Sequence, residues 1–317
     1  MSEFAILCIA VCLSAAALSI VAGVVAVHLS WMCLCRIGLQ RCLQRHPDLL
    51  FFIRTLPLSV PASLVLFAVL PSFLIMEPRE TTEKPEWLLL GLAAFSLMGV
   101  GVFALKFAGT FRDTRRAQRE WMQSARRLDS PAAIPIYELQ NPDSLVAVVG
   151  TVSPRIFIGK RILSSLTPEE LQAAVAHEIA HVHSLDNLRQ TLLRASRIFS
   201  LFAPIDRAFR SAAEISADER AVQSLISPLD LGSAIVKVAR FKAPLPSISA
   251  SHLVPESQGA ALQLRINHLQ ALLNEETNPS GAGKYGWIVA SMLVIVYLAK
   301  LQFWLLLAHK FTEVLVR

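Results

Sequence analysis

The side chains best suited to chemistry form an H-E-x-x-H pattern that runs from His177 to His181 and includes Glu178. Because positions four apart in an α-helix stack on one face, both imidazoles can reach one metal ion while Glu178 projects beside them. This arrangement is typical of zinc-dependent hydrolases. The alternative is a solvated helix face with two unrelated histidines, but the apolar Val175 and Val182 surround the pair.

A catalytic zinc site usually has three protein ligands, so a third must be found downstream. The longer pattern H-E-x-x-H-x-x-G-x-x-H fails, because Ser184 and Asn187 replace its glycine and last histidine. Glu214 and Asp218 instead offer two carboxylates four residues apart. We predict that Glu214 completes a site for one Zn²⁺ per chain and that Asp218 orients the imidazole of His177. An exposed helix face with an unrelated Glu/Asp pair is the alternative.

Both segments have helix signals. Thr167-Pro168-Glu169-Glu170 supplies an N-cap, a proline at the first helical position and a capping-box glutamate, which predicts a helix from Thr167 to about Leu201. A second helix is predicted from Arg207 to about Ser224. A Pro/Ser-rich loop, Lys242 to Ala260, leads to a last helix at Ala261 to Leu273.

Short β-branched runs upstream predict a small sheet, with strands at Ile134 to Glu138, Leu145 to Val149 and Arg155 to Ile158. We expect Arg155 to Lys160 to be an exposed edge strand, to which an extended substrate could add. The resulting domain is α+β, with the metal site on its helices.

The composition indicates a membrane protein, because 54% of the residues are hydrophobic and only 17% are charged. Four long apolar blocks are predicted to span the bilayer: Phe4 to Val27, Thr55 to Met76, Trp87 to Leu105 and Trp287 to Ala308. A cleaved signal peptide is the alternative for the first block, but no basic residue precedes it. Pro57, Pro61 and Pro71 should kink the second block, and Lys300 and Gln302 interrupt the fourth.

The net charge of +6 is not a sign of nucleic-acid binding, because the arginines concentrate beside the apolar blocks. The positive-inside rule predicts an external N-terminus and a cytoplasmic segment from Lys106 to Lys284. All five cysteines lie before residue 43 without metal-ligand spacing, so the catalytic portion cannot depend on disulfides. The apolar stretch Phe199 to Ile205 either enters the bilayer or packs on the domain.

Three parts are therefore expected in a mainly α fold. Residues 1–110 form a membrane region with three transmembrane helices, 111–284 form a cytoplasmic metallopeptidase domain, and 285–317 form a last transmembrane helix with a short tail. Because so little follows the last span, we expect no external sensor domain there.

The segment Ile134 to Leu272 resembles the integral-membrane gluzincins, which include the HtpX-like and prenyl-protein (CAAX) endopeptidases and the BlaR-type antibiotic-sensing peptidases. The resemblance rests on four motifs, at Pro154 to Ile158, Leu166 to Leu171, His177 to Asn187 and Glu214 to Asp218.

The resemblance implies a zincin-like catalytic domain in a bacterial inner membrane, with a protein or peptide substrate. It also implies that Glu178 is the general base and Glu214 the third ligand, in agreement with the assignment from spacing. Leu264-Arg265-Ile266 is similar to an arginine-containing segment near the end of these domains. Arg265 is predicted either to contact the substrate or transition state, or to be a structural salt-bridge partner.

The sequence allows three hypotheses for the function. The chain is expected to be a general membrane protease, a BlaR-like peptidase that cleaves a cytoplasmic repressor, or a catalytically silent membrane scaffold. The intact set of His177, Glu178, His181 and Glu214 argues against the scaffold. The sequence specifies neither the substrate nor the oligomeric state.

Overall fold

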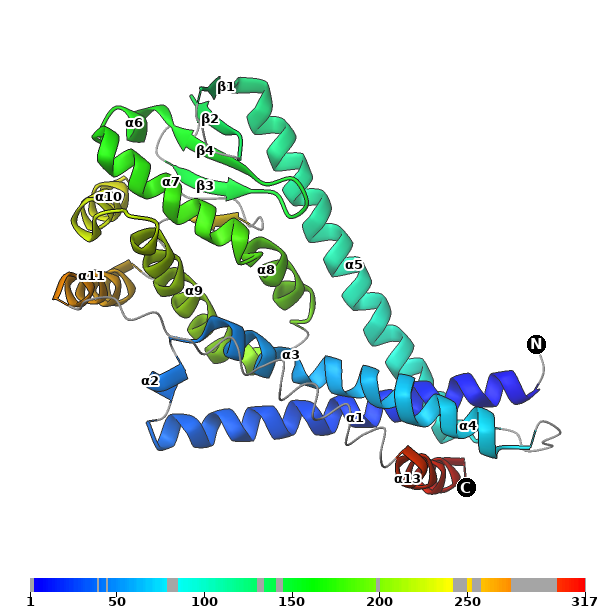
Figure 1. Ribbon diagram of the computed structural model, residues 1–317. Coiled ribbons are helices and arrows are strands. Elements are labelled where there is room, and N and C mark those ends of the chain that lie inside the picture. The colour runs from blue at the N-terminus through cyan, green and yellow to red at the C-terminus, as the bar shows by residue number, and fades with distance from the viewer. Residues whose placement is uncertain are drawn as a thin grey trace. The chain divides into compact units, whose positions relative to one another are not determined.

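The computed structural model describes residues 3–38, 40–43, 45–78, 85–129, 134–140, 145–197, 200–241, 250–252, 258–274 and 301–316 (Figure 1). The chain divides into two compact units. The first contains Met1–Cys33, Ile53–Val102 and Asn278–Arg317, and the second contains Leu34–Phe52 and Phe103–Thr277.

Three helical runs within the described residues are long and apolar enough to cross a membrane, namely Glu3–Arg36 (α1), Pro47–Met76 and Trp87–Ser124 (α5). The first three predicted spans are thereby confirmed as membrane-capable helices. Most of the predicted fourth span, including Lys300, lies outside the described residues. Its last part belongs to helix α13 (Leu301–Val316).

The second helical run passes its prolines without a break. It consists of α3 (Pro47–Leu64), the π-helical turn η1 (Val65–Val69) and α4 (Leu70–Met76). Pro71 has no amide hydrogen to donate to a preceding carbonyl. The wider π-turn comes directly before it, and the Leu70 N–H donates to the carbonyl of Val65. A local change of helix type therefore accommodates this proline.

Within the first unit the helices pack through apolar side chains and buried hydroxyls. Leu7, Val11 and Phe73 are completely or almost completely buried in one cluster. The Ser14 hydroxyl donates to the carbonyl of Leu89 at 2.9 Å, and the Ser72 hydroxyl donates to that of Leu305 at 3.0 Å. Such hydroxyl-to-carbonyl bonds join neighbouring helices where water is absent.

The second unit contains a five-stranded sheet in the order β1-β2-β4-β3-β5. The strands are β1 (Ala125–Leu128), β2 (Ile136–Leu139), β3 (Val146–Val149), β4 (Arg155–Gly159) and β5 (Ala250–His252). The pair β2–β4 is parallel and the other pairs are antiparallel. The three predicted strands are confirmed, whereas β1 and β5 were not expected.

The prediction that Arg155 to Lys160 forms an edge strand is wrong. Strand β4 lies in the interior of the sheet, because β2 pairs along one side of it and β3 along the other. Lys160 already belongs to helix α6 (Lys160–Leu163). The next strand, β3, is not an edge strand either, because β5 pairs along its other side.

Helices cover both faces of the sheet, because all four residues of β3 are buried although successive side chains point to opposite faces. Val146 and Val148 pack in a core cluster with residues of α7 (Pro168–His183), α9 (Ala203–Gln223) and α10 (Pro228–Arg240). Ala147 and Val149 point to the other face, where they pack with Trp121 of α5. Helix α5 extends well past the predicted end of its span at Leu105, and this extension lines the sheet.

The predicted helix from Thr167 to Leu201 is interrupted. Helix α7 ends at His183, Leu185 adopts a left-handed conformation with φ 55°, and α8 (Asp186–Ala195) follows.

The other helices of this unit are α2 (Gln40–Leu43), η2 (Ser200–Phe202) and α11 (Gln258–Asn274). Phe202 and Ile205 are buried, while Phe199 and most of the predicted loop at 242–260 lie outside the described residues.

Candidate metal centre

Helix α7 is fixed at its start by the predicted capping box. The Glu170 N–H donates to the Thr167 hydroxyl at 3.3 Å, and the Thr167 N–H donates to the Glu170 carboxylate at 2.8 Å. The same buried carboxylate accepts from Lys237 of α10 at 2.6 Å and from the Ser233 hydroxyl. These bonds hold the first turn of α7 against α10.

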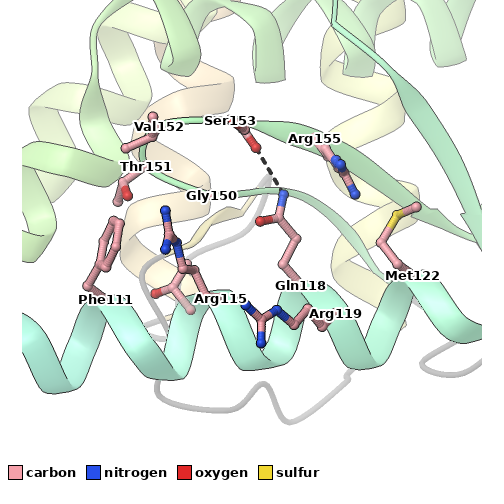
Figure 2. A pocket seen from close by; sticks show the side chains of 11 residues that line it. Phe111, Arg115, Gln118, Arg119, Met122, Gly150, Thr151, Val152, Ser153 and Arg155 are labelled. Atoms are coloured by element: carbon pink, nitrogen blue, oxygen red, sulfur yellow. Dashed lines mark hydrogen bonds between the residues drawn. The ribbon is translucent and has the colours of Figure 1, made fainter.

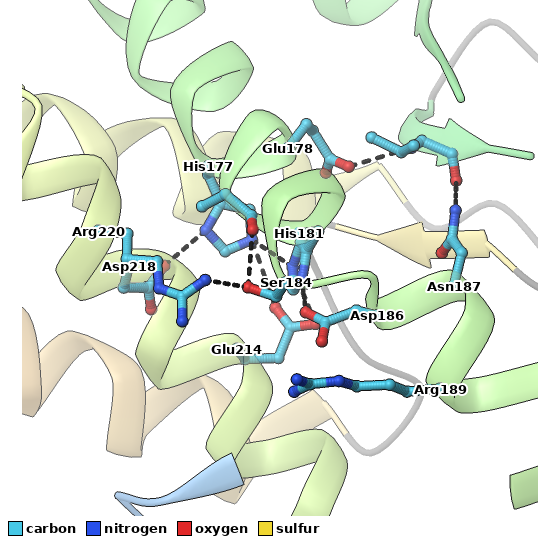
Figure 3. Close-up of polar contacts among 12 residues, drawn as sticks. His177, Glu178, His181, Ser184, Asp186, Asn187, Arg189, Glu214, Asp218 and Arg220 are labelled. Atoms are coloured by element: carbon cyan, nitrogen blue, oxygen red, sulfur yellow. Dashed lines mark hydrogen bonds and ion pairs between the residues drawn. The ribbon is translucent and has the colours of Figure 1, made fainter. Parts of the chain in front are cut away.

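Ten residues into α7, the two histidines converge with a glutamate from α9 (Figure 3). The Nε2 atoms of His177 and His181 lie 3.1 Å apart. The Glu214 carboxylate lies 3.5 Å from His177 Nε2 and 3.7 Å from His181 Nε2. All three residues are buried, and their ligand atoms lie within 4.8 Å of one another. The three predicted ligands thus form a group that could hold a metal ion.

The second nitrogen of each imidazole faces a carboxylate. Asp218 lies 2.9 Å from Nδ1 of His177, and Asp186 lies 2.7 Å from Nδ1 of His181. A carboxylate that accepts the Nδ1–H leaves the Nε2 lone pair free and makes it a stronger donor. Both Nε2 atoms face one common position, next to the Glu214 carboxylate. Two imidazole nitrogens and one carboxylate fit a divalent cation that prefers nitrogen and oxygen ligands, such as zinc.

Asp186 was not predicted as part of the site. It comes five residues after His181, and a continuous helix would have carried it past the imidazole. The break at Leu185 brings it back, and Arg220 of α9 donates to the Ser184 hydroxyl beside that break. No glycine or proline marks the interruption, so the sequence offers little local signal for it.

Arg265 of α11 joins the two carboxylates of α9. Its Nε and Nη2 atoms donate to Asp218 at 2.8 and 2.7 Å, and Nη1 lies 2.9 Å from Glu214. The Arg265 side chain is only 2% exposed. These contacts match the salt-bridge alternative predicted from the sequence, because the donors of the guanidinium are directed at protein carboxylates.

Burial and charge set the protonation of these groups. Burial alone would raise the pKa values of Glu214 and Asp218, but Arg265 together with the neighbouring ligand histidines outweighs it, so that both pKa values lie below their usual range. Burial lowers the pKa of His177, yet its hydrogen bonds to Asp218 and Glu214 outweigh this and raise the pKa to about 9. The surroundings therefore favour a positive charge at this imidazole, which a proton or a metal cation can supply.

Glu178 lies on the sheet side of the centre. Its Oε2 accepts the N–H of Val148 in β3 at 3.0 Å, whereas Oε1 is buried and has no hydrogen-bond partner among the described residues. Burial raises the pKa of Glu178 to about 7. A carboxylate with one tethered and one free oxygen, and with a pKa near neutrality, is suited to accept and return a proton.

Strand β3 is itself held in place from α8. The Asn187 side-chain amide donates to the carbonyls of Val148 and Gly150, each at 3.1 Å. In the sequence, Asn187 stands where the longer pattern would have its last histidine and belongs to the motif that carries the family resemblance, but it was given no role in the site. Its two hydrogen bonds hold strand β3, and the Val148 N–H of this strand donates to Glu178.

The model of the family described as BlaR1 peptidase M56 matches residues 87–269. The matched range contains α5, the helices that carry the three candidate ligands, and Arg265. It covers more than half of the chain and every residue placed in the candidate metal centre.

Proposed function

Because the chain belongs to the BlaR1 peptidase M56 family, we propose that it is a membrane-bound, zinc-dependent endopeptidase. The observation that carries the proposal is the convergence of His177, His181 and Glu214 beside the buried carboxylate of Glu178. Membership of the family supports peptidase activity in general. The geometry of the site supports zinc-dependent hydrolysis and the roles proposed for His177, His181, Glu214 and Glu178.

In this proposal His177, His181 and Glu214 hold the metal ion. A zinc ion bound there supplies a Lewis acid that polarises a carbonyl and makes water more acidic. Two neutral imidazoles and one carboxylate make three protein ligands, the number usual in catalytic sites that leave one position open. The buried Asp218 and Asp186 keep both imidazoles in the ligating tautomer.

Glu178 moves the proton. Its free Oε1 takes a proton from the attacking water and later returns it to the leaving amine. The bond from the Val148 N–H fixes the carboxylate so that Oε1 needs no reorientation between these two steps. Its raised pKa, about 7, matches a group that must be both base and acid near neutral pH.

Arg265 is a positioning residue in this proposal rather than a substrate contact. Its side chain is only 2% exposed, and its guanidinium is directed at Asp218 and Glu214, so it orients the third ligand and neutralises the paired carboxylates. A substrate would have to displace one of these bonds to reach it.

We further propose that the peptidase domain faces the cytoplasm of a bacterial cell. Lys106 and the arginines that follow it on α5 support this orientation through the positive-inside rule. Substrates would then be proteins at the inner face of the membrane.

Glu178→Gln tests the chemistry in the purified full-length protein. We expect the variant to retain about one zinc ion per chain and to lose peptide-bond hydrolysis. Glu169→Gln, on an exposed position of the same helix, is the matched control and should keep both properties. Hydrolysis by Glu178→Gln at the parental rate would overturn the proton-transfer role, and absence of stoichiometric zinc from the parental protein would favour a silent scaffold.

A second candidate, a signalling peptidase that cleaves a cytoplasmic repressor, is favoured by the BlaR1 description of the matched family. The two candidates share their chemistry and differ in substrate. Proteins that accumulate on the Glu178→Gln variant in cells distinguish them, because a signalling enzyme should trap one transcriptional regulator. A general protease should trap many membrane-proximal proteins.

A further inference from the structure

A basic groove lies between the extension of α5 and the turn that joins β3 to β4 (Figure 2). Its volume is about 330 Å³. Arg115 and Arg119 line it from α5, and Arg155 lines it from the start of β4. None of the residues that line this groove belongs to the metal centre, so a ligand bound here would not depend on the proposed peptidase chemistry.

The groove concentrates positive charge without an acidic counterpart. Its lining contains three arginines and no aspartate or glutamate. Within the described part of the chain, no ion pair joins Arg115, Arg119 or Arg155 to a carboxylate. The neighbouring Arg116, by contrast, is paired with Glu120 at 2.8 Å on an exposed face of α5. Three guanidinium groups that share one concave surface are a strong receptor for an anion.

The wall opposite α5 is held by hydrogen bonds from two side chains. The Gln118 side chain donates to the backbone carbonyl of Ser153 at 2.9 Å, and Asn187 holds the carbonyl of Gly150 from the other side. Gly150 has φ +116°, and a Cβ there would lie 2.6 Å from the Ser153 carbonyl oxygen. The turn therefore requires glycine and is fixed by side chains on both sides. A preformed wall lowers the entropic cost of ligand binding.

The remaining lining residues suit a phosphate group with an apolar substituent. Thr151 and Ser153 add hydroxyl groups, while Phe111 and Met122 add apolar surface. The guanidinium of Arg115 lies 4.4 Å from the centre of the Phe111 ring, which leaves its N–H edge available for an anion. Arginine forks match the geometry of phosphate oxygens and bind them through paired hydrogen bonds.

We propose that this groove binds a phosphate-bearing anion, through Arg115, Arg119 and Arg155. The same chemistry is offered by the headgroup of an anionic phospholipid and by a soluble phosphate. Arg115 lies on the same helix as the predicted span and follows its end at Leu105 by about 15 Å of helix, and the experiment distinguishes the two sources.

Thermal unfolding of the full-length protein in a neutral maltoside detergent tests the proposal. Three additives are compared at equal ionic strength: dioleoylphosphatidylglycerol, dioleoylphosphatidylcholine and inorganic phosphate. We expect phosphatidylglycerol, inorganic phosphate or both to raise the unfolding temperature with a saturable dependence, and phosphatidylcholine to have little effect. A shift with phosphatidylglycerol alone identifies a lipid source, and a shift with inorganic phosphate alone identifies a soluble one; either supports a phosphate site.

The groove variant is Arg115→Gln/Arg119→Gln/Arg155→Gln. It should weaken the apparent affinity about tenfold or more, because each guanidinium supplies a charge-assisted hydrogen bond. The single variant Arg119→Gln, at an exposed position, should weaken the apparent affinity less but in the same direction. It replaces the triple variant in the test if the triple variant does not fold.

The matched control removes three other exposed arginines of the same unit: Arg112→Gln/Arg116→Gln/Arg126→Gln. It lowers the net charge equally but leaves the groove intact, so it should respond like the parental protein. The proposal is overturned if neither anion shifts the transition, if phosphatidylcholine acts as strongly as phosphatidylglycerol, or if the groove variant responds as well as the control.

Discussion

The carboxylate of Asp186 lies 2.7 Å from Nδ1 of His181, although the end of one helix and the start of another separate the two residues. Both side chains are almost completely buried. The left-handed conformation of Leu185 makes this contact possible, because it turns the chain back toward α7. The second imidazole thus has its own carboxylate partner, as His177 has Asp218.

Asp186→Asn is therefore predicted to weaken zinc binding about 10- to 100-fold, the usual effect of removing a carboxylate that orients a ligand histidine. The asparagine keeps the size of the side chain but removes its charge, and its neutral amide oxygen is a weaker acceptor for the imidazole N–H than a carboxylate is. Competition with a chromophoric zinc chelator measures the affinity. Asp129→Asn, at an exposed position, is the control. Equal affinities in the two variants would show that His181 needs no such partner.

Local sequence signals were sufficient for the parts of the site that lie within one helix. The capping residues Thr167 and Glu170 predict where α7 begins, and the spacing of His177 and His181 predicts that their imidazoles share a face. Glu214 and Asp218 follow the same rule on α9. These relationships depend on helix geometry alone, which is why the sequence reveals them.

Relationships between distant segments were not predictable in this way. Strand β4 was expected at an edge because it precedes α7, but its β-branched residues fit an interior strand equally well. Strand β5 is only three residues long and has no local signature. Helix α10 was overlooked, although Ser227 accepts a capping hydrogen bond from the Leu229 N–H and Pro228 follows it, a helix-start signal present in the sequence.

Arg265→Met is predicted to destabilise the fold by about 3–5 kcal/mol, since it leaves two buried carboxylates without their counter-ion. Zinc binding should fall in parallel, because Glu214 loses the bond that orients it. Denaturant unfolding in detergent measures the first effect. Arg240→Met, at an exposed position of α10, should change stability little. If Arg265→Met instead raised only KM, Arg265 would be a substrate contact and the positioning role would be wrong.

The ion pair between Glu170 and Lys237 predicts a pH dependence of stability. Burial raises the pKa of Glu170, but its bonds from Lys237, Ser233 and the Thr167 N–H outweigh this and lower it below the ordinary value of 4.5. A carboxylate with a lowered folded-state pKa contributes stability that is fully present above the unfolded-state pKa. This contribution is lost as the pH falls through the folded-state pKa.

Glu170→Gln should therefore cost about 1.5–3 kcal/mol at pH 7, the usual contribution of charged hydrogen bonds. The difference between parental protein and variant should shrink as the pH falls below 4.5. Unfolding temperatures measured between pH 7 and pH 3 check this. Glu169→Gln, exposed on the same turn, is the control. A difference that stays constant over this range would mean that the charge of Glu170 does not contribute.

The end of α9 predicts a stabilising substitution. Leu225 follows the helix in a left-handed conformation with φ 67°, and its side chain is 98% exposed. A leucine in this conformation is disfavoured by contact between its Cβ and the backbone, a penalty that glycine avoids. Because the leucine side chain is almost fully solvated, its removal costs little packing.

Leu225→Gly is thus expected to raise the free energy of unfolding by about 1 kcal/mol. Leu229→Gly is the matched control, since Leu229 is 65% exposed but lies in the first turn of α10 with helical geometry. There, glycine should lower the stability by about 0.5–1 kcal/mol, because it loses more backbone entropy on folding. Thermal unfolding of both variants gives the sign directly. Equal destabilisation by both would mean that the backbone at Leu225 is not under strain.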